Sequence, residues 1–315
     1  MSACEASGMQ IFTFDYWSKD RLREDDILLV QDHPGEALFW RTFHFLKNFG
    51  ASRGGFLAQR RRFFLENHRF FRRRILWEGE SPAIVPYFYK NLENIIASGI
   101  YQKIILNTRH DDCSYFNYFD YRDKDFISPN FDDPKEKFIA MINTNVAPHS
   151  LTNNELYGER LKAIRYWSDV PGFDLYGYGW DRRPRHPLYF HYGKYVRKVF
   201  RGSVADKIKT LSSYKFTICF ANCAYRGYVD EKIFDCLAAG SIPIYLGAPD
   251  VEKSVPPSCF IDFRRFADYS ALHKFLSGLT EADLVKYRAE IRSFLNDYSA
   301  VKSMDQLIAE IVGIG

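Results

Sequence analysis

Residues 214–247 read YKFTICFANCAYRGYVDEKIFDCLAAGSIPIYLG, and this segment decides the fold of the chain around it. An apolar run over 216–220 is followed by a polar loop, an amphipathic stretch that ends at Gly240, and a second apolar run over 242–246. Short apolar runs on either side of a helical period predict a strand, a helix and a second, parallel strand.

Four polar residues lie in the loop and at the predicted helix start: Asn222, Tyr228, Glu231 and Lys232. Ligands of parallel sheets bind at the carboxyl ends of the strands, beside helix N-termini. A helix N-terminus with an adjacent lysine attracts phosphate, and a carboxylate there can accept hydrogen bonds from ribose hydroxyls. The residue types alone therefore predict a nucleotide site.

The same segment resembles the signature of the family 10 α-1,3/4-fucosyltransferases, which runs Y-K-F-x-L-x-F-E-N-S, then D-Y-V-T-E-K, then A-G-x-x-P-V-x-L-G. The matching residues are Tyr214, Lys215, Phe216, Phe220, Asn222, Tyr228, Val229, Glu231, Lys232, Ala239, Gly240, Pro243, Leu246 and Gly247. Two positions depart from the pattern: Ala221 stands where the family has Glu, and Asp230 where it usually has Thr. Asp230 suits a helix start, whereas the missing carboxylate at Ala221 leaves activity and donor choice open.

The composition predicts a folded chain with a large core. Its 315 residues are enough for two ordinary domains, and 46% are hydrophobic, which argues against disorder. The net charge of +4 does not by itself indicate nucleic acid, although arginines cluster at 60–74 and 182–201. We interpret the first cluster as a helix with a solvated face, with membrane-surface contact as the alternative. We interpret the second as a loop over the donor site, with RNA binding as the alternative.

The sequence also bears on location. It has no apolar run long enough to span a membrane, and its start lacks the pattern of a signal peptide. Its six cysteines include no C-x-x-C pair, and Cys219 and Cys236 fall in apolar runs. We therefore expect a reduced, cytoplasmic protein, either peripheral at a membrane surface or a form without its anchor.

Strand and helix patterns alternate along the chain, which predicts two parallel sheets. Strands are expected at 26–31, 74–77, 103–107, 138–143, 173–177, 216–220, 242–246 and 259–262. Helices are expected at 37–49, 63–71, 88–97, 154–167, 204–212, 231–240, 269–276, 281–294 and 304–311. The resemblance implies an α/β fold of the GT-B type, with two Rossmann-like domains facing across a cleft. We place an acceptor-binding domain at 1–135, a GDP-sugar-binding domain at 136–298, and a C-terminal helix at 299–315 that packs back on the first domain.

The resemblance also assigns donor-binding roles. Arg160, which precedes Tyr176-Gly177 by the family's interval of 16 residues, would contact the donor diphosphate together with Lys232. Glu231 would accept hydrogen bonds from the ribose, Asn222 and Tyr228 would line the sugar, and the backbone near Val204 would contact the guanine. The residues by themselves leave other roles open. Arg160 could be a solvated helix residue paired with Glu159 or Glu155, with Arg165 in its place at the phosphates. Tyr228 could be a core residue, and Glu231 could only cap the helix.

The catalytic base is expected in the first domain. Residues 77–82 read WEGESP, and the resemblance to an E-S-P motif assigns the base to Glu80, with Glu78 as the alternative and a plain surface-loop glutamate as the other interpretation. A carboxylate at a strand's carboxyl end can accept the proton of the attacking hydroxyl. The adjacent acidic pairs lie in predicted loops and form no D-x-D motif, so we expect no metal and no cofactor.

The leading hypothesis is an inverting glycosyltransferase that moves fucose from GDP-fucose to a hydroxyl of an acceptor oligosaccharide or glycoconjugate, with no nucleic-acid partner. One alternative keeps the fold and uses another GDP-sugar. Another is a non-catalytic protein that binds GDP-sugar or glycan.

Overall fold

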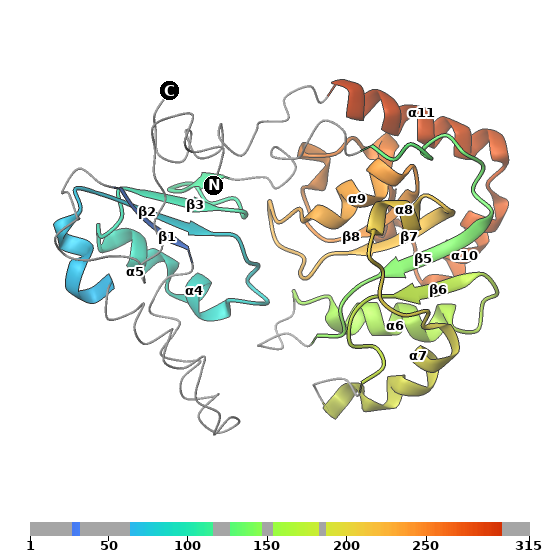
Figure 1. Cartoon of the computed structure of the whole chain (residues 1–315), viewed down its shortest axis with the longest axis horizontal. Coiled ribbons are helices and arrows are strands. Elements are labelled where there is room, and N and C mark those ends of the chain that lie inside the picture. The colour runs from blue at the N-terminus through green and yellow to red at the C-terminus, as the bar shows by residue number, and fades with distance from the viewer. Residues whose placement is uncertain (1–26, 32–63, 116–126, 147–153, 183–186, 298–315) are drawn as a thin grey trace. The chain divides into compact units, whose positions relative to one another are not determined.

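The computed structural model describes residues 27–31, 64–115, 127–146, 154–182 and 187–297 (Figure 1). Contacts divide the described chain into two compact units, one ending at residue 115 and the other beginning at residue 127. Each unit is built on its own parallel sheet.

The first unit has a sheet of order β1-β2-β3-β4, and all of its strands are parallel. The strands are β1 (Ile27–Gln31), β2 (Arg73–Glu78), β3 (Lys103–Leu106) and β4 (Ser114–Tyr115). A 3-10 turn at His68–Phe70 precedes β2, and the helices α4 (Pro86–Lys90) and α5 (Leu92–Ala97) connect β2 to β3. Glu78 pairs with Leu106, so β2 and β3 end side by side. The polar residues that follow both strands therefore meet at one edge of the sheet.

The second unit has a sheet of order β6-β5-β7-β8-β9, again parallel throughout. Its strands are β5 (Lys137–Ile142), β6 (Phe173–Tyr176), β7 (Tyr214–Phe220), β8 (Ile242–Leu246) and β9 (Ile261–Asp262). Its helices are α6 (Tyr157–Trp167), α7 (Gly193–Val199), α8 (Lys207–Leu211), α9 (Glu231–Ala239), α10 (Tyr269–Gly278) and α11 (Glu281–Asp297). Short 3-10 turns lie at Pro187–Tyr192, Val251–Lys253, Pro257–Cys259 and Phe263–Arg265.

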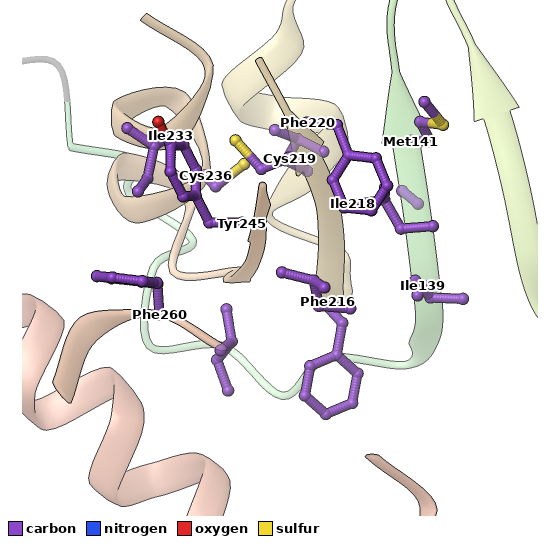
Figure 2. Close-up of a cluster of buried hydrophobic side chains, with 14 of the residues drawn as sticks. Ile139, Met141, Phe216, Ile218, Cys219, Phe220, Ile233, Cys236, Tyr245 and Phe260 are labelled. Carbon is purple, nitrogen blue, oxygen red and sulfur yellow. The ribbon is translucent and has the colours of Figure 1, made fainter. Parts of the chain in front are cut away.

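Strand β7 lies in the middle of this sheet because nearly every one of its side chains is apolar enough to be buried on both faces. Figure 2 shows part of the resulting core, in which Phe216 and Ile218 of β7 lie near Ile139 of β5. Cys219 of β7 lies beside Cys236 of α9. Burial of both cysteines agrees with their interpretation as small hydrophobic residues.

The order of strands reverses between β5 and β7. From β5 the chain first forms β6 on one side and then crosses to form β7 on the other. In open parallel sheets such a switch point opens the crevice in which ligands bind, at the carboxyl ends of the two strands. The sheet order therefore places the candidate site at the ends of β5 and β7.

Helix α9 has a defined start and a defined end. Asp230 is its N-cap, and the carboxylate accepts a hydrogen bond from the backbone N–H of Lys232 at 3.3 Å. At the other end Gly240 has φ +69°, and a Cβ there would come within 2.5 Å of the carbonyl oxygen of Phe131. Only glycine fits this left-handed position without strain, so the helix stops where the sequence predicts.

The predicted parallel sheets and most predicted elements are confirmed, and three differences have local causes. The helix predicted at 88–97 is two short helices that meet at Asn91. The two-residue strand β4 was not predicted. Residues 187–199, predicted as a loop, form a 3-10 turn and α7, because Val196 and Val199 bury one side of an otherwise basic segment. The helices predicted at 37–49 and 304–311 lie outside the described residues.

The segment 127–135 is part of the second unit and is hydrogen-bonded to the end of α9. The Ser128 N–H donates to the Ala238 carbonyl, and the buried ammonium of Lys135 donates to the carbonyls of Asn130 (2.8 Å) and Ala239 (3.4 Å). The predicted domain boundary, at residues 135 and 136, follows this segment directly. The functions assigned to the two domains stay predictions, and the helix predicted at 299–315 lies outside the described residues.

A partly buried carboxylate ties β6 to β7 inside the second unit. Asp174 accepts hydrogen bonds from the Tyr214 hydroxyl at 2.7 Å and the Arg201 guanidinium at 2.6 Å. Burial by itself raises the pKa of Asp174, but these two hydrogen bonds outweigh burial, so the pKa lies below its ordinary value.

We expect Asp174→Asn to lower the free energy of unfolding at pH 7 by about 1–2 kcal/mol, because hydrogen bonds to a charged group are lost. The folded-state pKa is the lower one, so this stabilisation is present above the unfolded-state pKa and disappears as pH falls through the folded-state value. Urea unfolding at pH 7 and near pH 3 should show the difference between the two proteins shrinking at the lower pH. The exposed pair of Asp169 and Lys198 provides the control, since Asp169→Asn should cost less than about 0.5 kcal/mol. An equal difference at both pH values would contradict this account.

Candidate functional site

Arg160 is the central residue of the candidate site. It lies in α6 with only 3% of its surface exposed. Its Nε and Nη2 donate to the carbonyl oxygen of Phe220 at 3.0 and 2.7 Å, and Nη2 also donates to Asn222 Oδ1 at 2.8 Å. The guanidinium therefore joins the helix after β5 to the carboxyl end of β7, across the switch point. The alternative of a solvated Arg160 paired with Glu159 or Glu155 is wrong, because the guanidinium is buried.

Asn222 and Tyr228 extend this connection. The side-chain amide of Asn222 accepts from Arg160 through Oδ1 and donates through Nδ2 to the Tyr228 hydroxyl at 3.2 Å. Backbone hydrogen bonds fix the same loop, because Leu156 N–H donates to the Asn222 carbonyl at 3.1 Å. Three residues that the sequence assigns to the site are thus one hydrogen-bonded series, and the buried side chain of Tyr228 is held in it through its hydroxyl.

Asp230, Glu231 and Lys232 form a charged group at the N-terminus of α9. The Lys232 ammonium lies 2.8 Å from Asp230 Oδ2 and 3.5 Å from Glu231 Oε1, with 20% of its side chain exposed. Asp230 is almost completely buried, with 1% of its surface exposed. The helix N-terminus and Lys232 together make this burial of a carboxylate tolerable.

The pKa values of these residues reflect their mutual contacts. Burial disfavours the charged form of Lys232, but the carboxylates of Asp230 and Glu231 outweigh burial and raise its pKa above the ordinary value. For Asp230 burial dominates and raises the pKa, although Lys232 and Arg160 both oppose the rise. Burial also acts to raise the pKa of Glu231, but Lys232 and the nearby Lys207 lower it overall. Lys232 is therefore a cation at neutral pH.

Arg160 belongs to the same electrostatic group as Lys232. Its positive charge acts to lower the pKa values of both Lys232 and Asp230. This influence is smaller than that of burial or of the ion pairs. The structure thus brings two cations from distant parts of the sequence to the carboxyl edge of one sheet.

Val204 lies in the loop before α8, half-buried. This loop follows α7 and lies beside the carboxyl end of β6, where Gly177 N–H donates to the Gly202 carbonyl at 3.0 Å. Lys207 connects this loop to the charged group, at 4.0 Å from Glu231 Oε1 and 3.6 Å from Asp235 Oδ2.

Ala221, where the resembling family has Glu, is completely buried at the end of β7. Its N–H donates to the Leu246 carbonyl at 2.8 Å. A Cβ on Gly247 would come within 2.8 Å of Ala221 Cβ and 2.3 Å of the Tyr245 hydroxyl. Small residues at 221 and 247 therefore pack closely around the tyrosine, and residue 221 is an interior position in this protein.

In the first unit, Glu78 and Glu80 have different surroundings. Glu78 ends β2 with none of its surface exposed, and its Oε1 accepts the Glu80 N–H at 3.0 Å. Glu80 is exposed in the loop that follows. A general base must come within hydrogen-bond distance of the substrate hydroxyl, and the exposed Glu80 side chain is accessible to a ligand.

Two further observations concern metals and membranes. Among the described residues, no group of three or more His, Cys, Asp or Glu side chains is arranged to hold a metal ion. Every helix in the described part of the chain is too short or too polar to span a membrane.

Comparisons with known proteins agree with this architecture. Anabaena HepE, crystallised with UDP-glucose, matches with a TM-score of 0.54 at 10% identity, over 91% of this chain and 98% of that chain. The likeness is one of fold, and it confirms the predicted α/β fold of the GT-B class.

The family is shown by sequence. Residues 133–289 match the model described as glycosyltransferase family 10 (fucosyltransferase) C-term. The chain therefore belongs to glycosyltransferase family 10. An α-(1,3)-fucosyltransferase of Helicobacter pylori is 26% identical over 61% of this chain and 45% of its own length. An α-(1,4)-fucosyltransferase of Arabidopsis thaliana is 40% identical over 24% of this chain and 19% of its own length. This chain thus matches less than half the length of either relative.

The sequence did not reveal two partners in the site. The Phe220 carbonyl carries no mark in the sequence, because any residue has one. The sequence also did not predict the ion pairs of Lys207. The helix was expected to begin at Val204, and nothing in its pattern indicated a contact with α9. The signal was present in Asp206, which caps α8 through the Lys209 N–H at 2.9 Å and so makes Lys207 the first helical residue.

We expect Lys232→Met to lower the free energy of unfolding by about 3–5 kcal/mol, because it leaves the Asp230 carboxylate buried without its cation. Adding Asp230→Asn should recover most of that loss, since the double variant buries no charge. Urea unfolding of the two single variants and the double variant gives the coupling energy. Lys207→Met is the matched control and should cost less than about 1 kcal/mol, because its side chain is half-exposed. Additive effects of the substitutions at 230 and 232 would contradict the pairing.

Proposed function

We propose that this protein transfers fucose from GDP-fucose to a hydroxyl of an acceptor glycan, with inversion at the anomeric carbon. The family membership of the second unit supports the reaction class. The observation that carries the proposal is the joint placement of Arg160 and Lys232 at the carboxyl edge of the sheet, beside the switch point. Two cations there fit a ligand with a diphosphate group.

Arg160 and Lys232 are proposed to bind the diphosphate of the donor. Two of the guanidinium nitrogens of Arg160 are engaged by Phe220 and Asn222, whereas its Nη1 has no hydrogen bond within the described chain and is the group proposed for phosphate. Negative charge grows on the leaving diphosphate as the glycosidic bond breaks. A unit charge pair about 4 Å apart is worth about 4 kcal/mol at an intermediate dielectric, and the part that develops only in the transition state increases the rate.

The remaining donor contacts are proposals on the same basis. Glu231, whose carboxylate is partly exposed at the helix start, is proposed to accept hydrogen bonds from the ribose. Asn222 and Tyr228 are proposed to line the sugar, and the backbone near Val204 to contact the guanine. Because Arg160 and Lys232 supply positive charge, we propose that the reaction needs no metal ion or other cofactor, and activity that survives EDTA would support this.

Glu80 is proposed as the general base. Its carboxylate would accept the proton of the acceptor hydroxyl while that oxygen forms a bond to the anomeric carbon and the bond from that carbon to the diphosphate oxygen breaks. Attack on the face opposite the leaving group converts a β-linked donor into an α-linked product.

Ala221, which replaces the Glu of the family signature, is the feature that favours two alternatives. The first alternative is the use of another GDP-sugar. Ala221 is buried, so the loss of the family's Glu at this position changes the packing beneath the loop after β7. The second alternative is a non-catalytic protein that binds GDP-sugar or glycan.

We also propose a cytoplasmic location, which cell fractionation would test.

We expect GDP-fucose and GDP to bind with a measurable heat in calorimetry, and GDP to bind at least tenfold more weakly to Lys232→Met, a loss of about 1.4 kcal/mol. Lys209→Met removes an exposed lysine of α8 and should bind like the natural protein. The measurement is made at a temperature where each variant is folded. Tighter binding of another GDP-sugar would favour the first alternative, and binding without transfer to any glycan of an acceptor array would favour the second.

We expect Glu80→Gln to reduce transfer by about 10²–10⁴-fold, because the amide cannot accept the proton, while affinity for GDP stays unchanged. Initial rates with a glycan acceptor and GDP calorimetry on the same sample check both statements. Glu93→Gln, which changes an exposed glutamate of the same unit, is the control and should stay active. Full activity of Glu80→Gln would refute the assignment of the base.

A further inference from the structure

The backbone at Gly79 and Glu80 is held by three side chains. The Gly79 carbonyl accepts from Asn107 Nδ2, the Glu80 N–H donates to Glu78 Oε1 at 3.0 Å, and the Glu80 carbonyl accepts from the Tyr89 hydroxyl at 3.0 Å. Three consecutive backbone polar groups are thus bound by side chains from the end of β2, from α4 and from the residue after β3.

Two of these three residues, Tyr89 and Asn107, are themselves held by further hydrogen bonds. The Tyr89 hydroxyl, which donates to Glu80, accepts from Thr108 Oγ1 at 3.3 Å. Asn107 is buried just after β3, and its own N–H donates to the Glu78 carbonyl at 3.3 Å. We call Glu78, Tyr89 and Asn107, which bind the backbone of Gly79 and Glu80, the clamp. It is anchored in the sheet through Glu78 and Asn107, because β2 and β3 end at the same level.

The residues that hold this backbone are more buried than Glu80 itself. Glu78 and Asn107 are buried and Tyr89 is half-buried, whereas the Glu80 side chain is exposed. A loop residue held only by solvent would sample many backbone conformations, and fixing one residue costs about 1–2 kcal/mol of conformational entropy. Here the hydrogen bonds from Glu78, Tyr89 and Asn107 offset that cost for Glu80.

We propose that Glu78, Tyr89 and Asn107 are positioning residues that hold the Glu80 carboxylate in its reactive place. This inference rests on the proposed role of Glu80 as the base. A misplacement of a reacting group by about 1 Å can reduce a rate by about 10²-fold, so hydrogen bonds to the backbone of the base can affect catalysis without touching the substrate.

The sharpest variant is Tyr89→Phe, which removes one hydroxyl and keeps the ring. We expect kcat for transfer to fall about tenfold or more, while the KM for the GDP-sugar, the affinity for GDP and the melting temperature change little. Tyr87→Phe removes a hydroxyl from an exposed residue of the same helix and is the matched control, with kcat unchanged. Asn107→Ser provides a second variant, which loses the hydrogen bond to Gly79, and we expect a similar loss of kcat.

A double-variant cycle separates positioning from a purely structural role. If Tyr89 acts through Glu80, adding Tyr89→Phe to Glu80→Gln should cause no further loss of rate beyond that of Glu80→Gln alone. Multiplicative losses in the double variant, or a natural kcat for both Tyr89→Phe and Asn107→Ser, would overturn the proposal. Failure of the proposed base looks different, because Glu80→Gln would then be active by itself. If no GDP-sugar is turned over by the natural protein, the reaction itself is wrong.

Discussion

The second unit depends on the contact between the Arg160 guanidinium and the Phe220 carbonyl. The carbonyl lies at the carboxyl end of the central strand, where it is buried and needs a donor, and Arg160 supplies two N–H groups from a helix on the other side of the switch point. Since the same guanidinium also holds Asn222, the loop after β7 has one defined path. The position of Tyr228 then follows, because its hydroxyl accepts from Asn222.

A second constraint is the burial of charge at the start of α9. Asp230 is needed as the helix cap, but its carboxylate is nearly inaccessible to water, so Lys232 must stay beside it. The result is a cation held by carboxylates at a helix N-terminus, close enough to Arg160 for each to influence the other. For the diphosphate that we propose as its ligand, such a site is pre-organised, because the cost of bringing the charges together is met during folding rather than during binding.

Both units use the same structural solution. Polar side chains from neighbouring helices and strand ends hold the backbone at the carboxyl edge of a parallel sheet. In the second unit Arg160 and Asn222 hold the end of β7, and in the first unit Glu78, Asn107 and Tyr89 hold the loop after β2. In each case the buried partners leave a charged side chain at least partly exposed, Lys232 in one unit and Glu80 in the other.

Local sequence patterns are enough to predict the βαβ arrangement over residues 214–247, the parallel sheets, the cap at Asp230 and the stop at Gly240, because periodicity and backbone preference act over a few residues. Residue type and resemblance also identified Arg160, Asn222, Tyr228 and Lys232 as candidates. The packed structure was needed to show that Arg160 is buried rather than solvated and that Ala221 is an interior residue. It also showed that residues 187–199 are helical and that the backbone of Glu80 is clamped by Tyr89 and Asn107. These facts depend on partners such as Phe220, which is 60 residues away from Arg160, and no local pattern records a hydrogen bond to a distant backbone carbonyl.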